Sequence, residues 1–167
     1  MRTRRAALVA TALWPAGGLL GCGFELRRAA ALPMKSIALT GFQPGSPLAV
    51  AMRRALRDSG VALRDNPAQA EVVLEALADT RERTVAASTA VGQVRELQLR
   101  VRLRFRLATP AGRLLIVPTE LLLTRDMSFS ETAALAKQQE ESLLYGAMDE
   151  DIVAQVLRRL ASVQSGA

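Results

Sequence analysis

The most regular pattern of hydrophobic and polar positions lies between Val94 and Ala108. Apolar residues occupy alternate positions there, namely Leu97, Leu99, Val101, Leu103, Phe105 and Leu107. The positions between them are polar or charged. A period of two over this length is typical of a β-strand with one buried face, because successive side chains point to opposite sides of a sheet. The segment is therefore predicted to be a long, half-buried strand.

Further strands are expected on both sides of this segment. Residues 71–85 alternate in the same way, and the small, polar residues 86–93 are expected to form a mobile turn. The sequence Thr-Pro-Ala-Gly at 109–112 predicts a tight turn, so that 113–129 returns as an antiparallel strand. Pro118 cannot donate a hydrogen bond to a neighbouring strand, and the alternation changes phase there. This combination predicts a bulge or an edge position.

Two helices and one short strand complete the expected architecture. Residues 36–40 form the short strand, and a helix begins at Ser46-Pro47, because serine is a good N-cap and proline suits the first helical position. Apolar residues at helical spacing run through 130–163, whose first turns should fray or form a separate short helix. The order predicts an α+β two-layer sandwich, in which a mixed sheet of about four strands carries both helices on one face.

The N-terminus has the features of a bacterial lipoprotein signal. Three arginines near the start precede an apolar run at 6–20, and Leu-Leu-Gly at 19–21 leads directly into Cys22. The Cys22 thiol can take up a lipid, after which cleavage would make it the first residue. A transmembrane anchor is the alternative, but a spanning helix needs about twenty apolar residues. The run is shorter than that and contains Pro15.

These features divide the chain into four expected parts. They are a lipoprotein signal peptide at 1–21, a lipidated tether at 22–35, a single domain at 36–163 and a disordered tail at 164–167. The expected domain is long enough for one hydrophobic core. Because a lipid would use the only thiol of the chain, no disulfide is expected.

Composition excludes several kinds of chemistry. The chain contains no histidine, so it cannot form a Ser-His-Asp site or a histidine metal site. The acidic clusters at 140–141 and 149–151 fall on a helical pattern and are interpreted as solvated. A hydrolase using Glu140 or Asp149 is the remaining catalytic alternative, and it would need inward-facing carboxylates with raised pKa values. We expect no enzymatic activity, no cofactor and no metal.

Charge suggests a partner surface only in one place. The formal net charge of +6 falls when the arginines of the signal are removed, and basic residues interleaved with aromatics are absent, so nucleic acid is not expected. The polar face of the long strand carries four arginines, here called the arginine ladder: Arg100, Arg102, Arg104 and Arg106. The ladder is either a solvated face compensated by cross-strand neighbours such as Glu75 or Glu120, or a surface for an anionic partner. A guanidinium suits such a partner because it binds two phosphate oxygens at once.

Several segments resemble one family of proteins. Cys22 followed by Gly-Phe-Glu-Leu-Arg at 23–27 is similar to the mature start of the lipopolysaccharide-assembly lipoproteins LptE, also called RlpB. The C-terminal part is similar as well. There, Arg-Asp-Met-Ser-Phe at 125–129 precedes Ala-Leu-Ala-Lys at 134–137 and Val-Leu-Arg-Arg-Leu at 156–160. The order and spacing of these segments together carry the resemblance.

The resemblance implies an outer-membrane lipoprotein that faces the periplasm, with two helices on a four-stranded sheet. Such proteins sit as a plug inside the LptD β-barrel, help it assemble and, with it, deliver lipopolysaccharide to the outer leaflet. The implied partners are an LptD-like outer-membrane β-barrel, lipopolysaccharide, and the membrane through the lipid anchor. Gly23 follows the cysteine where an aspartate would signal inner-membrane retention, which favours the outer membrane.

The resemblance also implies lipopolysaccharide-binding residues. One basic residue of the family lies in the Ala-Leu-Ala-Lys segment, which carries over to Lys137. The other lies in the loop before the long strand, where Gln93 breaks the match and Arg95 is the expected replacement. The usual aromatic pair before the last helix is reduced to Phe129. A different periplasm-facing lipoprotein scaffold, binding an acidic protein or peptidoglycan, is the alternative function.

Overall fold

The computed structural model describes residues 32–163, which form a mixed five-stranded sheet with two α-helices. The elements follow in the order β1 (Ser36–Thr40), α1 (Pro47–Asp58), β2 (Ala62–Leu63), η1 (Pro67–Gln69), β3 (Val72–Ser88), β4 (Val94–Ala108), β5 (Leu114–Ser128), η2 (Glu131–Ala133) and α2 (Ala134–Ala161). The expected signal peptide, the lipidation site Cys22 and the expected tail at 164–167 lie outside the described residues.

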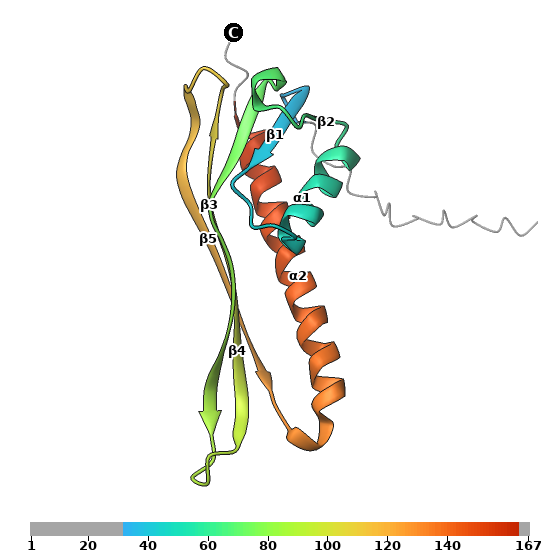
Figure 1. Ribbon diagram of the computed structural model, residues 1–167, viewed down its shortest axis with the longest axis vertical. Coiled ribbons are helices and arrows are strands. Elements are labelled where there is room, and N and C mark those ends of the chain that lie inside the picture. Colours follow the sequence, from blue (N-terminus) through green and yellow to red (C-terminus); the bar gives the residue numbers. More distant parts are fainter. Residues whose placement is uncertain (1–31, 164–167) are drawn as a thin grey trace, which may run out of the picture.

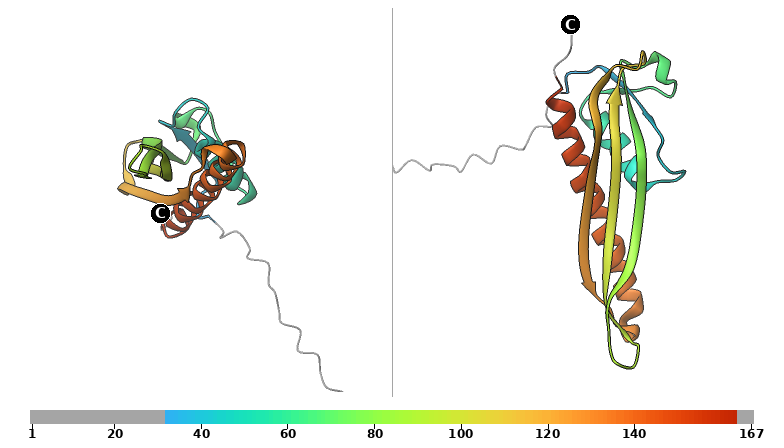
Figure 2. Two further views of the ribbon diagram at one scale, coloured as in Figure 1. Left: turned by 90° about the horizontal axis from the view of Figure 1, so that it is seen from below. Right: turned by 90° about the vertical axis from the view of Figure 1, so that its left-hand side faces the viewer.

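The sheet order is β2-β1-β3-β4-β5. β1 pairs in parallel with both of its neighbours, whereas β3, β4 and β5 form an antiparallel meander. Both helices cover the same face of the sheet (Figures 1 and 2). The predicted α+β class with two helices on one face is therefore confirmed. The sheet has one strand more than expected, because β2 contains only two residues and carries no alternation that a sequence could reveal.

The core lies between the helices and the apolar face of the sheet. The alternating residues of β4 point inward as predicted, and Leu99, Leu103 and Phe105 are completely buried. Met148 and Ile152 of α2 are equally buried and belong to the same cluster. Burying side chains of this size contributes about 1.5–3 kcal/mol each. The core also begins earlier than the predicted domain, because Met34 of the expected tether is buried in it.

The sheet narrows after the first few residues of β3. β1 pairs only with the residues 72–75 of β3 and then turns away at Gly41, whose φ angle is +76°. A Cβ atom at Gly41 would collide with the backbone oxygen of Ala76, so the close crossing requires glycine. Beyond this point β3 has no strand neighbour on that side within the described residues. The molecule therefore tapers from a broad end to a narrow one (Figure 1).

The predicted irregularity near Pro118 is a bulge on an edge strand. Thr119 of β5 pairs with Phe105 of β4, and Ile116 pairs with Leu107. Two residues of β5 therefore face one residue of β4, and the proline needs no partner for its nitrogen.

The turn between β3 and β4 differs from the expectation. β3 extends to Ser88, so most of the segment expected to be a mobile turn is either strand or a closed loop. The Thr89 and Gln93 backbones are joined by a hydrogen bond of 2.8 Å, and the Gly92 nitrogen donates to the Thr89 oxygen at 2.9 Å. Gly92 adopts a φ angle of +82°, which allows the chain to reverse over this short distance.

Both helices begin much as predicted. The Ser46 hydroxyl caps α1 by accepting a hydrogen bond of 3.1 Å from the Ala49 nitrogen, and Pro47 takes the first helical position. The short helix η2 precedes α2, in agreement with the expected separate turn. α2 contains 28 residues, and at 1.5 Å per residue it is about 42 Å long. It runs from the narrow end of the molecule to the broad end (Figure 1).

Candidate functional site

The narrow end of the molecule, here called the distal tip, consists of residues 89–95 and 128–137. The first segment is the loop between β3 and β4, and the second leads from β5 into α2. The Phe129 nitrogen donates a hydrogen bond of 2.8 Å to the Arg95 oxygen and joins the two segments. Between them lies a cavity of about 260 Å³, lined by Gln93, Val94, Arg95, Ser130, Glu131 and Thr132.

Lys137 lies in the first turn of α2 and is held at this tip by two contacts. Its Nζ atom donates to the Ser128 hydroxyl at 2.8 Å and lies 2.8 Å from Oε2 of Glu140, one turn along the helix. The Lys137 side chain is 19% exposed, so its amine is fixed at the surface rather than free in solvent. Since Glu140 compensates its charge, an anionic ligand would have to replace this carboxylate.

The structure brings the two predicted lipopolysaccharide-binding residues to the same end of the molecule. Arg95 contacts Phe129, and Lys137 contacts the preceding residue, Ser128. The Arg95 side chain is exposed and, within the described residues, has no ion-pair partner. Gln93, the residue aligned with the second basic position of the family, lines the cavity beside it. Their roles in binding remain predictions.

The arginine ladder lies on the sheet face that the helices leave open, and two of its four arginines are ion-paired within the described residues. Arg106 pairs with Glu75 at 2.6 Å, and Arg102 pairs with Glu120 at 3.2 Å, the two acidic neighbours expected from the sequence. Nε of Arg100 donates to the Gln98 side chain at 2.9 Å, whereas Arg104 has no ion pair within residues 32–163. These contacts fit a solvated face, and binding of an anionic partner by the ladder remains a prediction.

Asp149 is the carboxylate that sequence reasoning placed wrongly. It was expected on a solvated helix face, but it is 4% exposed and belongs to the inner side of α2. Its Oδ2 atom lies 2.6 Å from a guanidinium nitrogen of Arg81, which also stacks over the Tyr145 ring at 4.4 Å. Burial raises the pKa of Asp149, the neighbouring Arg81 partly offsets this, and Asp79 raises it further.

The sequence did contain a signal for this placement. Asp149 follows Tyr145 by four residues and precedes Val153 by four, and both neighbours are buried. Residues at this spacing share one face of a helix. Glu140, the other candidate carboxylate, is half exposed and paired with Lys137, so the two candidates lie in different surroundings.

The described residues contain no cluster of three or more acidic, histidine or cysteine side chains that could hold a metal ion. Between residues 32 and 163, neither helix combines the length and the apolar character needed to cross a membrane.

Comparison with known proteins places this fold in one family. The family model for LptE, described as lipopolysaccharide-assembly, matches residues 34–160. The LPS-assembly lipoprotein LptE of Pectobacterium atrosepticum is 27% identical over 146 residues, which cover 86% of this chain and 78% of that protein. The LptE lipoprotein of Photorhabdus laumondii is 25% identical over 147 residues, covering 87% and 80%.

Solved structures agree with these matches. The solution structure of lipoprotein B from Nitrosomonas europaea superimposes with a TM-score of 0.70 at 27% identity, covering 84% of this chain and 91% of that one. Rare lipoprotein B from Shewanella oneidensis gives a TM-score of 0.62 at 26% identity, covering 76% and 94%. Fold and sequence thus define an envelope-associated lipoprotein of lipopolysaccharide assembly. The chain belongs to the LptE family.

Proposed function

We propose that this protein is an outer-membrane lipoprotein that plugs an LptD-like β-barrel, assists its assembly and binds lipopolysaccharide at the distal tip. The proposal starts from membership of the LptE family, which assigns a role in lipopolysaccharide assembly. Cys22 is the proposed lipid anchor, facing the periplasm. More than one acyl chain is needed for stable attachment, because a single chain binds membranes only marginally.

The charged outer face of the sheet supports the role of a plug. The helices cover one face of the sheet (Figure 2). The other face carries the charged pairs of the arginine ladder. A polar outer surface is suited to the inside of a barrel, because barrel interiors are themselves polar.

The position of Lys137 carries the proposal for lipopolysaccharide. Its amine is held by Ser128 at the narrow end of the molecule, and the exposed Arg95 belongs to the adjoining strand. Phosphate groups of lipopolysaccharide can pair with both cations. The Glu140 carboxylate is 45% exposed, so a phosphate can approach from the solvent and take its place at the Lys137 amine.

The two lysines of the chain provide a matched test of this site. Lys35 lies at the broad end, just before β1, whereas Lys137 lies at the distal tip. Binding of purified lipopolysaccharide to the full mature chain would be measured with the variants Lys137→Met and Lys35→Met. We expect Lys137→Met to weaken binding about tenfold, equivalent to about 1.4 kcal/mol, and Lys35→Met to leave it unchanged. Equal effects of the two substitutions would contradict a specific site at the tip.

A second experiment tests the partner. Purification of the tagged chain from native membranes in mild detergent should recover a large outer-membrane β-barrel in stoichiometric amount. Recovery as a free monomer, together with normal surface lipopolysaccharide after depletion, would favour the alternative of a different periplasm-facing scaffold.

A further inference from the structure

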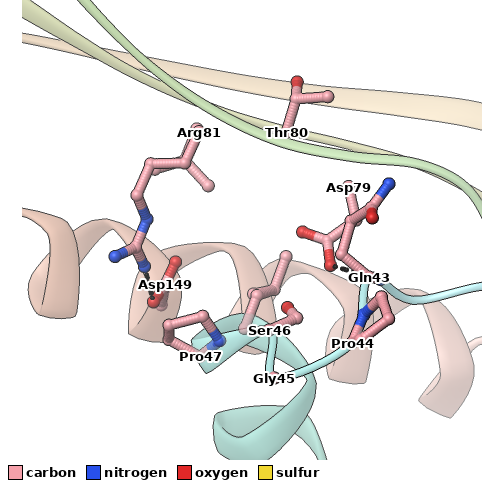
Figure 3. Close-up of a pocket in the computed structure, with 11 residues that line it drawn as sticks. Gln43, Pro44, Gly45, Ser46, Pro47, Asp79, Thr80, Arg81 and Asp149 are labelled. Carbon is pink, nitrogen blue, oxygen red and sulfur yellow. Dashed lines mark hydrogen bonds and ion pairs between the residues drawn. The ribbon is translucent and has the colours of Figure 1, made fainter.

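A second pocket lies away from the distal tip, where three elements meet (Figure 3). The loop 43–46 between β1 and α1 forms one wall, β3 forms another, and Asp149 of α2 closes the side. The pocket has a volume of about 240 Å³. Its apolar lining comes from Pro44, Pro47, Leu48 and Val101, so the pocket combines an apolar wall with charged groups.

The charged groups of this pocket do not balance. Asp79 and Asp149 lie on opposite sides of the gap in Figure 3, and among the described residues Arg81 is the only cation that lines it. Arg81 is committed to Oδ2 of Asp149 at 2.6 Å. Within the part of the chain that the structure describes, Asp79 accepts one long hydrogen bond of 3.3 Å, from the Gln43 nitrogen. One negative charge is therefore left uncompensated.

One oxygen of the pocket lacks any donor. Oδ1 of Asp149 is buried and has no hydrogen-bond partner among residues 32–163, although only 5% of the Asp149 side chain is exposed to solvent. Leaving a buried acceptor unsatisfied costs about 1–3 kcal/mol, and more when the group is charged. The neighbouring Tyr145 hydroxyl does not supply the bond, because it donates to the Glu82 oxygen at 2.8 Å. The site therefore holds an acceptor that one additional donor would satisfy.

The pocket continues into a groove between the two helices. Pro47 and Asp149 line both, and the groove has a volume of about 520 Å³. Its lining includes the exposed Val50 and the apolar residues Val153 and Leu157. An extended segment lying in this groove would bring one of its side chains to the mouth of the pocket.

We propose that the groove and the pocket form a docking site for a partner protein, which inserts a lysine side chain between Asp79 and Asp149. An ammonium group carries three donors and can bond Oδ1 of Asp149 and the Asp79 carboxylate together. The aliphatic stem of lysine suits the apolar wall to which Pro44, Pro47, Leu48 and Val101 contribute. A metal ion is a poorer occupant, because Ca²⁺ takes six to eight oxygen ligands and the pocket offers two carboxylates.

This inference is independent of lipopolysaccharide binding, because it uses none of the residues of the distal tip. Lys137→Met should weaken lipopolysaccharide binding and leave the docking site intact. Asp149→Asn should weaken docking and leave lipopolysaccharide binding intact. The two proposals can therefore fail separately.

Titration with n-butylammonium chloride tests the chemistry of the pocket. The full mature chain in non-ionic detergent would be followed by NMR through the amides of Gln43, Gly45 and Ser46. We expect saturable shifts in the wild type and at least tenfold weaker binding in Asp149→Asn and in Asp79→Asn. Asp65→Asn, a charge change at an exposed residue that lines neither the pocket nor the groove, should leave binding unchanged.

Two probes distinguish a specific site from a general effect. Sodium chloride at equal ionic strength controls for screening, and n-butanol controls for the apolar stem. The proposal would be overturned if sodium chloride or n-butanol shifted the same amides as strongly as n-butylammonium does. It would also be overturned if Asp149→Asn bound n-butylammonium as tightly as the wild type. Folding of each variant is checked by its NMR spectrum, and Asp79→Asn preserves the test if Asp149→Asn unfolds.

Cross-linking in native membranes tests the occupant. A carbodiimide joins a carboxylate to an adjacent amine, so it should link Asp79 or Asp149 to a lysine of a second protein, identified by mass spectrometry. Asp65, an exposed carboxylate that lines neither the pocket nor the groove, serves as the internal control for non-specific linkage. If n-butylammonium binds but no such link forms, the partner lysine is refuted in favour of a small amine.

Discussion

At the scale of single residues, Asp149 and Glu140 illustrate how the same helix holds two carboxylates with different roles. Asp149 lies on the buried side of α2 and is paired with Arg81 of β3. Glu140 lies nearer the start of the helix, half exposed, and compensates Lys137. Each carboxylate therefore leads to a separate prediction.

The pH dependence of stability should reveal Asp149. Its raised pKa means that the folded chain binds a proton at a pH where the unfolded chain, with a pKa near 3.9, has lost it. The stability gained from this proton is present below about pH 4 and is lost as pH rises through the folded pKa. The wild type should therefore lose free energy of unfolding relative to Asp149→Asn as pH rises.

Denaturant unfolding over a pH series measures this difference. Glu150→Gln, one residue along on the exposed face, is the matched control and should follow the wild type. Parallel curves for wild type and Asp149→Asn would contradict the raised pKa.

Glu140 should act as a competitor for lipopolysaccharide at Lys137. The carboxylate occupies the amine at 2.8 Å, so replacing it by the neutral Glu140→Gln should strengthen binding several-fold. The comparison is Glu141→Gln, which removes the same charge from a group paired with Arg83 instead. Isothermal titration with lipopolysaccharide distinguishes them, and weaker binding by Glu140→Gln would mean that Glu140 positions the lysine.

At the scale of elements, local sequence patterns predicted the structural features that depend on a single segment of the chain. The alternation of β4, the bulge near Pro118 and the Ser46-Pro47 start of α1 each depend on neighbouring residues, and the structure confirms them. β2 was missed because two residues carry no period. The parallel pairing of β1 and the Arg81–Asp149 ion pair join segments far apart in sequence, which no local pattern encodes.

Gly41 provides a test of how β1 leaves the sheet. Gly41→Ala should destabilise the fold by more than the roughly 1–2 kcal/mol that a left-handed backbone conformation costs an L-residue, because the new methyl group also meets the Ala76 oxygen. Gly60→Ala is the matched control, since Gly60 has a similar φ of +78° but open space around it. Thermal unfolding of the two variants compares the effects, and equal losses would contradict the close crossing.

At the scale of the whole molecule, stability should follow the taper. The broad end contains all five strands and both helices, whereas three strands and α2 continue to the distal tip (Figure 1). Along the part of β3 that has no neighbouring strand on one side, α2 supplies side-chain contacts instead, such as the ion pair between Arg83 and Glu141 at 3.1 Å. The candidate lipopolysaccharide site thus lies on the part with the thinnest core.

Hydrogen exchange measures this gradient. Amides near Leu103 and Phe105 should be protected the most, and those in the loop 89–93 the least, because the former lie in the buried core and the latter in an exposed turn. Lipopolysaccharide should slow exchange at the tip without changing the centre. Uniform protection along β4 would contradict the gradient.

The placement of β1 has a consequence for how the chain acquires its fold. β1 comes first in the sequence yet occupies an interior position of the sheet, where it pairs with β2 and with residues 72–75 of β3. The β3–β4–β5 meander can form from neighbouring segments, whereas β1 must wait for loops of considerable length to close. The N-terminal strand of the described fold, to which the proposed anchor at Cys22 leads, would then be the last part to lock into place.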